Sequence, residues 1–60
     1  MILPKDPFML LSFINTKLRD EYRNLEDLCK SLNVERTHIE TTLSSIEYTY
    51  DNELNRFTAV

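Results

Sequence analysis

The 60-residue chain contains no glycine and a single cysteine, Cys29. Without glycine, a backbone position that needs a positive φ falls to the residue types that tolerate it next best, chiefly asparagine. A single cysteine excludes an intrachain disulfide and a zinc site built from several thiols, and it favours a reducing, cytoplasmic location. We expect Cys29 to act as a small apolar core residue, the alternative being a reactive thiol.

The sequence also lacks a long apolar run. The stretch from Phe8 to Ile14 is far shorter than the roughly 20 apolar residues that span a bilayer. Asp6 precedes this stretch and no small-residue cleavage site follows it, so we expect no signal peptide. The sequence thus predicts a protein without membrane association.

Positive charge is scarce. The chain has 7 Lys and Arg against 10 Asp and Glu, which gives a net charge of -3. A free-standing nucleic-acid binder usually carries a basic patch. Residues 25–47 are the most acidic segment and sum to -3, whereas residues 1–24 sum to +1. Nucleic acid is therefore a disfavoured partner.

The composition, 42% hydrophobic and 28% charged, is that of an ordinary globular domain. We expect one domain, residues 1–60. A chain of this length buries only about 60% of the surface that its unfolded form exposes, so its core is marginal and a partner subunit would help it.

The first expected helix covers about residues 7–22. Asp6 can accept a hydrogen bond from a free backbone N–H at the helix start, and Pro7 loses nothing at the first helical position. Successive residues of an α-helix are rotated by about 100°, which places five residues on one stripe that should face the core: Leu10, Leu11, Ile14, Leu18 and Tyr22. The helix dipole favours the basic residues that gather near the helix end: Lys17, Arg19 and Arg23.

A helix-turn-helix is predicted over residues 24–47. Asn24 can cap a short helix over residues 25–32. Asn33 stands where a helix commonly ends in a left-handed residue, and a third helix follows over about residues 35–47. Both helices direct apolar side chains into a shared wedge: Leu25, Leu28, Cys29, Leu32, Val34, Ile39, Leu43 and Ile46.

The C-terminal segment, residues 48–59, changes to a period of two. Tyr48 and Tyr50 alternate with a threonine, the turn residues DNELN follow, and a second strand-like run closes the chain. This pattern predicts a β-hairpin with Asn52 or Asn55 as the left-handed residue of its loop. The expected fold class is mostly α with a small β-hairpin (α+β): a three-helix helix-turn-helix domain with a C-terminal hairpin, in the layout of a minimal winged helix.

The outward face of the third helix is the candidate DNA reader. Hydroxyl side chains dominate this face and carboxylates flank it, whereas affinity for DNA comes mainly from Lys and Arg. A solvated or protein-contacting face is therefore favoured. Under the DNA alternative, the contacts would be Arg36, Thr37, Thr41, Ser44 and, from the hairpin, Arg56.

A second apolar strip lies on the first helix, where Met9 and Phe13 are one turn apart and point toward Lys17. A helix that is apolar on two sides is either sandwiched within its own domain or docks a partner. The first case needs Ile2, Leu3 or the hairpin to cover the strip. The second predicts a symmetric dimer or a docking surface, with Met9, Phe13 and Lys17 as the candidate protein interface.

Catalysis finds little support. His38 is the only histidine and is expected on the surface of a helix. The sequence has no nucleophile with a base at motif spacing, no glycine-rich phosphate loop and no cluster of metal ligands. We expect a non-enzymatic protein with no cofactor, no metal and no small-molecule substrate.

Three stretches carry a resemblance that covers nearly the whole chain. The opening LPKDP, the helical segment INTKLRD and the hairpin entry YTYD resemble a family of very short bacterial proteins catalogued as domain of unknown function 4250. The resemblance implies a stand-alone bacterial protein and brings no catalytic residue and no established ligand. Within these stretches Asn15, Thr16 and Arg19 lie in mid-helix, where they form either a candidate polar binding surface or a solvated helix face.

The leading functional hypothesis is a cytoplasmic protein-interaction or self-associating module on a helix-turn-helix scaffold. Its partner would be another protein or a second copy of the chain. The alternative is a dimeric DNA-binding protein that inserts its third helix into the major groove.

Overall fold

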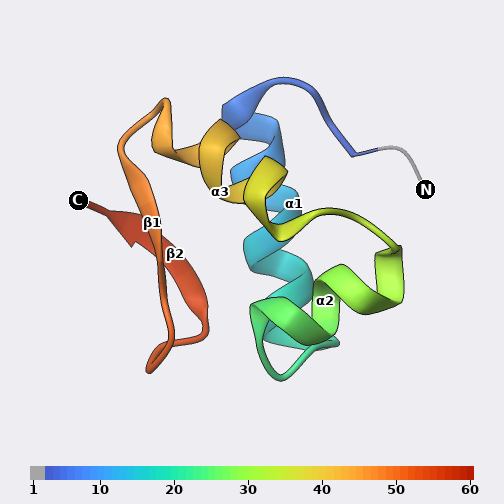
Figure 1. The fold of residues 1–60 in the computed structure, drawn as a ribbon. Coiled ribbons are helices and arrows are strands. Elements are labelled where there is room, and N and C mark those ends of the chain that lie inside the picture. Colours follow the sequence, from blue (N-terminus) through green and yellow to red (C-terminus); the bar gives the residue numbers. More distant parts are fainter. Residues whose placement is uncertain (1–2) are drawn as a thin grey trace.

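The structure, a computed structural model, describes residues 3–60 and contains three helices followed by a two-stranded antiparallel hairpin (Figure 1). The elements in chain order are α1 (Pro7–Asp20), α2 (Leu25–Leu32), α3 (Arg36–Ser44), β1 (Tyr48–Asp51) and β2 (Arg56–Ala59). The expected fold class, mostly α with a C-terminal hairpin, is confirmed. None of the described helices has both the length and the apolar character needed to cross a membrane.

α1 begins as its sequence predicts. The backbone N–H of Phe8 donates to Asp6 Oδ1 at 2.8 Å, and Pro7 is the first helical residue. The helix ends at Asp20, two residues before the expected end at Tyr22, because Glu21 leaves the helical conformation with a φ of -129°. Tyr22 nevertheless packs against the core from the following turn.

α2 and α3 form the predicted helix-turn-helix. Asn24 Oδ1 caps α2 by accepting the backbone N–H of Asp27 at 2.8 Å. Asn33 is left-handed, with a φ of 56°, and the N–H of Val34 donates to the carbonyl of Cys29 at 3.0 Å across the turn. In a chain without glycine, asparagine thus makes the corner between the two helices.

α3 begins one residue later than expected and ends at Ser44, three residues before the expected end. In the turn that follows, the N–H of Ile46 donates to the carbonyl of Leu43 at 3.2 Å, and that of Glu47 donates to Ser44 at 2.9 Å. Glu47 is left-handed, with a φ of 63°. The chain reverses here to enter β1, and the local sequence places no asparagine at the residue that must adopt the positive φ.

β1 and β2 pair with Tyr50 opposite Phe57 and Asp51 opposite Arg56. Of the two expected loop residues, Asn55 is the left-handed one, with a φ of 53°. The ring centroids of Tyr50 and Phe57 lie 5.5 Å apart, and both side chains pack into the core. These aromatic residues close the core of the domain.

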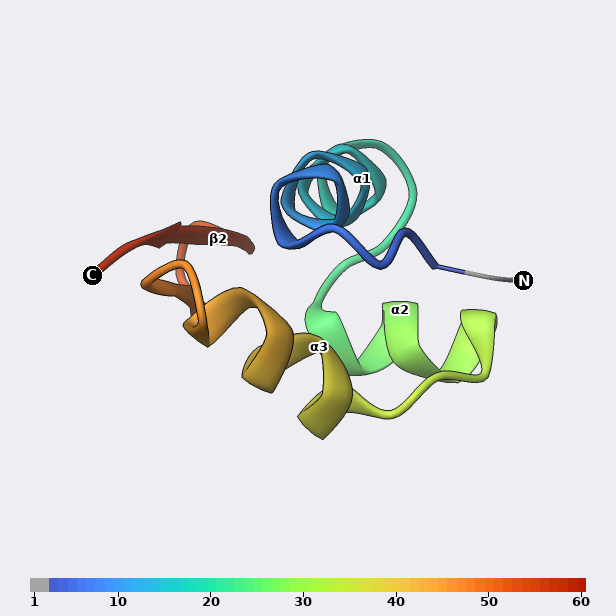
Figure 2. The same ribbon diagram turned by 90° about the horizontal axis from the view of Figure 1, so that it is seen from above.

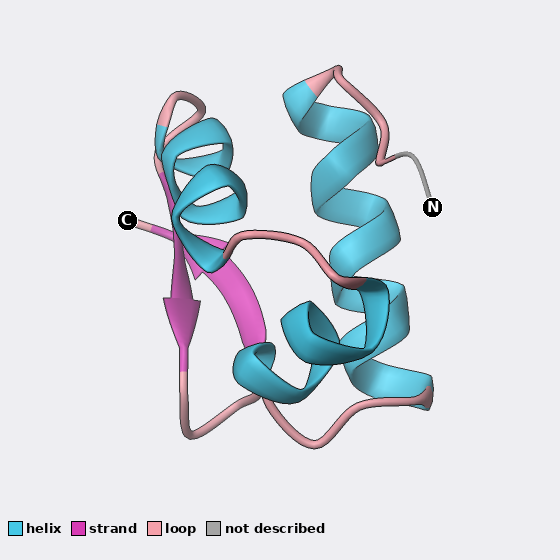
Figure 3. Ribbon diagram, turned by 45° about the vertical axis from the view of Figure 1, so that its right-hand side comes forward, coloured by secondary structure: helices cyan, strands magenta, loops and turns pink. Residues whose placement is uncertain are grey.

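One hydrophobic core connects all five elements. Figure 2 shows α1 end-on, with α2 and α3 along one side of it and the hairpin at the end of α3. Figure 3 shows α2 crossing near the C-terminal end of α1 and the hairpin beside α3. The buried core residues are Leu10, Ile14, Leu18, Leu25, Leu28, Cys29, Ile39, Leu43 and Phe57.

The second apolar strip of α1 is divided between the interior and the surface. Phe13 is half-buried and packs against the core, as does Leu3 from the segment that precedes α1. Met9 keeps 61% of its surface exposed, and the neighbouring Phe8 keeps 65%. Ile2, the other residue expected to cover the strip, lies outside the described residues.

Candidate functional site

An open cleft of about 500 Å³ lies between α1 and the hairpin. One wall is the C-terminal half of α1, and the other is the hairpin loop with the start of β2. The lining residues are Asn15, Thr16, Leu18 and Arg19 on α1, and Leu54, Asn55 and Arg56 on the hairpin. Because the walls are distant in sequence, the cleft exists only when the hairpin folds back onto α1.

Asn15 joins the two walls. Its Nδ2 donates to the carbonyl of Phe57 at 3.1 Å, and its Oδ1 accepts the N–H of Phe57 at 2.8 Å. A side-chain amide thereby bonds both polar backbone groups of a strand residue, as a neighbouring strand would. Asn15 therefore has a structural role in the cleft wall, and both ends of its amide are occupied.

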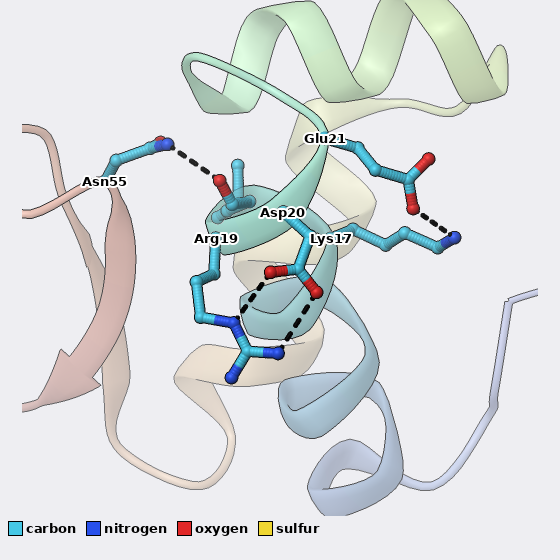
Figure 4. Close-up of polar contacts among 6 residues, drawn as sticks. Lys17, Arg19, Asp20, Glu21 and Asn55 are labelled. Carbon is cyan, nitrogen blue, oxygen red and sulfur yellow. Dashed lines mark hydrogen bonds and ion pairs between the residues drawn. The ribbon is translucent and has the colours of Figure 1, made fainter.

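Asn55 closes the cleft where α1 ends. Its Nδ2 donates to the carbonyl of Leu18, in the last turn of α1, at 3.2 Å and to that of Tyr22, just after the helix, at 3.0 Å. Figure 4 shows Asn55 reaching the end of α1 from the hairpin. Its Oδ1 accepts the hydroxyl of Tyr50 at 2.7 Å, and that hydroxyl accepts the N–H of Leu25 at 3.2 Å. This network fixes the hairpin relative to the end of α1 and the start of α2.

Two arginines give the cleft its charge. Arg19 donates to both carboxylate oxygens of Asp20, at 2.8 and 3.0 Å (Figure 4). This hydrogen-bonded pair raises the pKa of the Arg19 guanidinium and lowers the pKa of the Asp20 carboxyl. Arg56 is exposed on β2 and makes no ion pair with any residue from 3 to 60.

An apolar side chain stands beside these charges. Leu54, in the hairpin loop, is 56% exposed. The loop is held by Asp51, whose Oδ1 accepts the N–H of Glu53 at 2.9 Å and of Leu54 at 3.1 Å. The cleft thus combines cationic groups with an exposed leucine on a supported loop.

The polar surface that the sequence predicts on the first helix gathers in this cleft. Asn15, Thr16 and Arg19 all line it. Arg56 joins them, although the sequence grouped this residue with possible DNA contacts of the third helix. Leu54 carried no signal in the sequence, because its place in the cleft follows only from the position of the folded loop.

The candidate protein interface predicted on the first helix, Met9, Phe13 and Lys17, lies outside the cleft lining. Lys17 Nζ is 2.6 Å from Glu21 Oε2 and 5.7 Å from the ring centroid of Phe13. The hydrogen bond to Glu21 raises the pKa of Lys17. Met9 is exposed and Phe13 is half-buried, so these residues offer a partner only part of the apolar strip.

The candidate DNA contacts are divided between two parts of the molecule. Four are exposed on α3: Arg36, Thr37, Thr41 and Ser44. Arg36 pairs with Glu40 at 3.4 Å and lies 5.6 Å from the ring centroid of Tyr50, so a carboxylate offsets its charge. Arg56 instead lines the cleft with Arg19.

Reactive side chains do not gather at the cleft. Cys29 is 8% exposed within the core, as expected of a small apolar residue, and burial raises the pKa of its thiol. His38 is exposed on α3. Among residues 3–60, no three His, Cys, Asp or Glu side chains come together as a possible metal site.

No curated protein and no solved structure matches the chain. A family model described as a domain of unknown function (DUF4250) matches residues 4–57. The matched span includes both walls of the cleft and all three stretches on which the resemblance rests, apart from the leucine at position 3. The chain therefore belongs to the DUF4250 family, a domain of unknown function.

Proposed function

We propose that this chain is a non-enzymatic protein-interaction module that takes up a segment of a partner protein in the cleft between α1 and the hairpin. The cleft itself is the observation that carries the proposal. It is open, has a volume of about 500 Å³ and combines exposed arginines with an exposed leucine. Arginine is enriched in protein interfaces and often contributes strongly to binding energy.

The support of the cleft walls adds to this argument. Asn15 and Asn55 bond backbone groups across the cleft, so α1 and the hairpin are held at a fixed separation before a partner arrives. A preformed surface pays less ordering entropy on binding than a mobile one. A reducing cytoplasmic location suits the proposal, since the one thiol, Cys29, is buried as a core residue.

Panning a phage-displayed library of short random peptides against the immobilised protein tests this function. We expect peptides to be enriched and, on titration into isotope-labelled protein, to shift the amide resonances of Thr16, Arg19, Leu54 and Arg56. The variant Leu54→Ser should weaken binding. Its matched control, Met9→Ser, changes a similarly exposed apolar residue outside the cleft and should bind as the original chain does. Failure to enrich any peptide, or resonance shifts that avoid the cleft, would overturn the proposal.

Self-association is the other form of an interaction module. Its support is Met9, exposed on the outer side of α1, whereas Phe13 is half-buried and offers less area. Light scattering separates the two forms. A monomer at high protein concentration leaves the cleft as the interaction site, while a dimer that Met9→Ser dissociates would replace it with the α1 surface.

DNA binding through α3 has less support. Glu40 offsets the charge of Arg36, and the other candidate contacts on α3 are hydroxyl groups. The net charge of -3 would also oppose approach to the phosphate backbone.

A further inference from the structure

We infer that the segment taken up by the cleft is acidic: a peptide that places a carboxylate against Arg56 and Arg19 and an adjacent apolar side chain against Leu54. This inference rests on the proposed function and names the chemistry of the partner. Four observations carry it: the groups in the cleft that remain free to bind, the two guanidinium groups, the exposed leucine and the charge of the surrounding molecule.

The amide side chains of the cleft are already occupied. Asn15 uses its oxygen and its nitrogen on the backbone of Phe57. Asn55 uses its nitrogen on two carbonyls of the α1 end and its oxygen on the hydroxyl of Tyr50. Recognition of a polar ligand in the cleft is thereby left mainly to the guanidinium groups and to the Thr16 hydroxyl, which favours a ligand that accepts hydrogen bonds.

The two guanidinium groups differ in how many of their N–H donors remain free to bind a ligand. Arg19 binds Asp20 through Nε and Nη2, so its other terminal nitrogen stays available. Arg56 makes no ion pair within residues 3–60. Its cross-strand neighbour Asp51 has one carboxylate oxygen bound to the N–H groups of the loop. Asp20 offsets the charge of Arg19. Asp51 lies opposite Arg56 but makes no ion pair with it, so the Arg56 guanidinium remains free to bind a carboxylate of the ligand. Hydrogen bonds between a guanidinium and a carboxylate are among the strong ones, and they have a defined geometry.

The apolar part of the ligand follows from Leu54. This side chain is 56% exposed at the cleft, next to Asn55 and Arg56 in the sequence. An apolar residue beside the carboxylate would bury it, and removing apolar surface from water favours binding. A purely ionic ligand would leave this contact unused.

The helix-turn-helix carries a net charge opposite to that of the arginines in the cleft. Residues 25–47, which contain α2 and α3, sum to -3. An acidic segment is repelled there, whereas Arg19 and Arg56 attract it at the cleft. Such complementarity fixes where a partner docks and discriminates against partners of the wrong charge.

Charge reversal gives the test. Three pools of fluorescent peptides share degenerate apolar positions and carry Glu, Gln or Lys at the remaining positions, and fluorescence anisotropy measures their binding. We expect the Glu pool to bind about tenfold more tightly than the Gln pool, the ratio produced by about 1.4 kcal/mol of binding free energy. The Lys pool should bind most weakly. The variant Arg56→Glu should lose the Glu pool and gain affinity for the Lys pool.

The control is Arg23→Glu, which makes the same change of charge at an exposed arginine outside the cleft lining. It should keep the preference for the Glu pool, and circular dichroism checks that both variants remain folded. Equal binding of the three pools overturns the inference but leaves the proposed function standing. No binding by any pool, together with no peptide enriched from the random library, overturns both. A preference for Glu that Arg23→Glu abolishes and Arg56→Glu does not would also overturn the inference.

Discussion

Asparagine side chains hold together much of this small domain. Asn33 and Asn55 adopt the positive φ that the chain cannot assign to glycine, and Asn15 and Asn55 bond backbone groups on other elements. The left-handed role of Asn33 is predictable, because it depends only on its position after a helix. The bonds of Asn15 to Phe57 are not, because these residues are 42 positions apart and meet only in the folded chain.

Replacing Asn15 with alanine should destabilise the fold. It leaves the N–H and the carbonyl of Phe57 without a protein partner in a partly buried place, and each lost bond costs about 1 kcal/mol or more. We expect a loss of about 1–3 kcal/mol in the free energy of unfolding, measured with urea. The control substitution Thr16→Ala, at the exposed neighbouring position, should change the free energy of unfolding by less than about 0.5 kcal/mol. Similar effects of the two substitutions would contradict the structural role of Asn15.

The Cys29 thiol should make stability depend on alkaline pH. Burial, its largest cause, raises the pKa of the folded thiol, as do Glu40, Glu26 and Glu35, while Arg36 opposes the shift. The unfolded chain therefore loses the thiol proton at lower pH than the folded one. The stabilisation from this group is complete below the thiol's ordinary pKa of about 8.5 and is lost as pH rises through the folded pKa.

Comparing the chain with its Cys29→Ala variant isolates this contribution from the titration of other groups. Urea unfolding at a series of pH values should show the stability difference between the two proteins narrowing above about pH 8.5. A difference that stays constant into the alkaline range would refute the prediction.

At the scale of elements, the junction between α3 and β1 departs most from what the sequence predicts. The apolar period continues to Ile46, so local sequence favours a helix to about residue 47, but α3 ends at Ser44. Ile46 still packs against the core, from a turn instead of a helix. Pairing of β1 with β2 fixes where the strand must begin, and the helix ends early to allow the chain to reverse.

Glu47 is under backbone strain at this junction, since its φ is 63°. Glu47→Gly should stabilise the fold by about 0.5–1 kcal/mol. The left-handed conformation costs a residue with a Cβ about 1–2 kcal/mol, and glycine avoids this cost. Part of the gain is offset because glycine loses more conformational entropy on folding. Denaturant unfolding measures the change. The matched control, Glu40→Gly within α3, should instead cost about 1 kcal/mol. If both substitutions destabilised the protein alike, Glu47 would not be the strained residue.

At the scale of the whole molecule, the distribution of charge sets what the domain can bind. The helix-turn-helix has the packing of a DNA-binding motif, but its wedge residues lie inside and its outer face carries hydroxyls and carboxylates. Two basic residues that are distant in sequence, Arg19 and Arg56, both line the cleft between α1 and the hairpin.

Duplex DNA should therefore not bind. An electrophoretic shift experiment with random-sequence duplex at low salt, where phosphate contacts are strongest, should show no retarded band. Retardation that disappears as salt is raised, and that Arg36→Ala abolishes, would contradict this expectation and point to α3 as the reading helix.

The sequence by itself determined the order of the elements, the caps at Asp6 and Asn24, the corner at Asn33 and the acidic balance of the chain, because these depend on neighbouring residues and on composition. It also singled out Asn15, Thr16 and Arg19 as one polar surface. Only the tertiary structure decided that Arg56 and Leu54 complete that surface and that the amide of Asn15 is occupied. The reason is that the cleft forms only when the hairpin docks on α1. The packing of Phe57 in the core and the hydrogen bonds of Asn15 and Asn55 hold the hairpin there, and these contacts join residues far apart in the sequence.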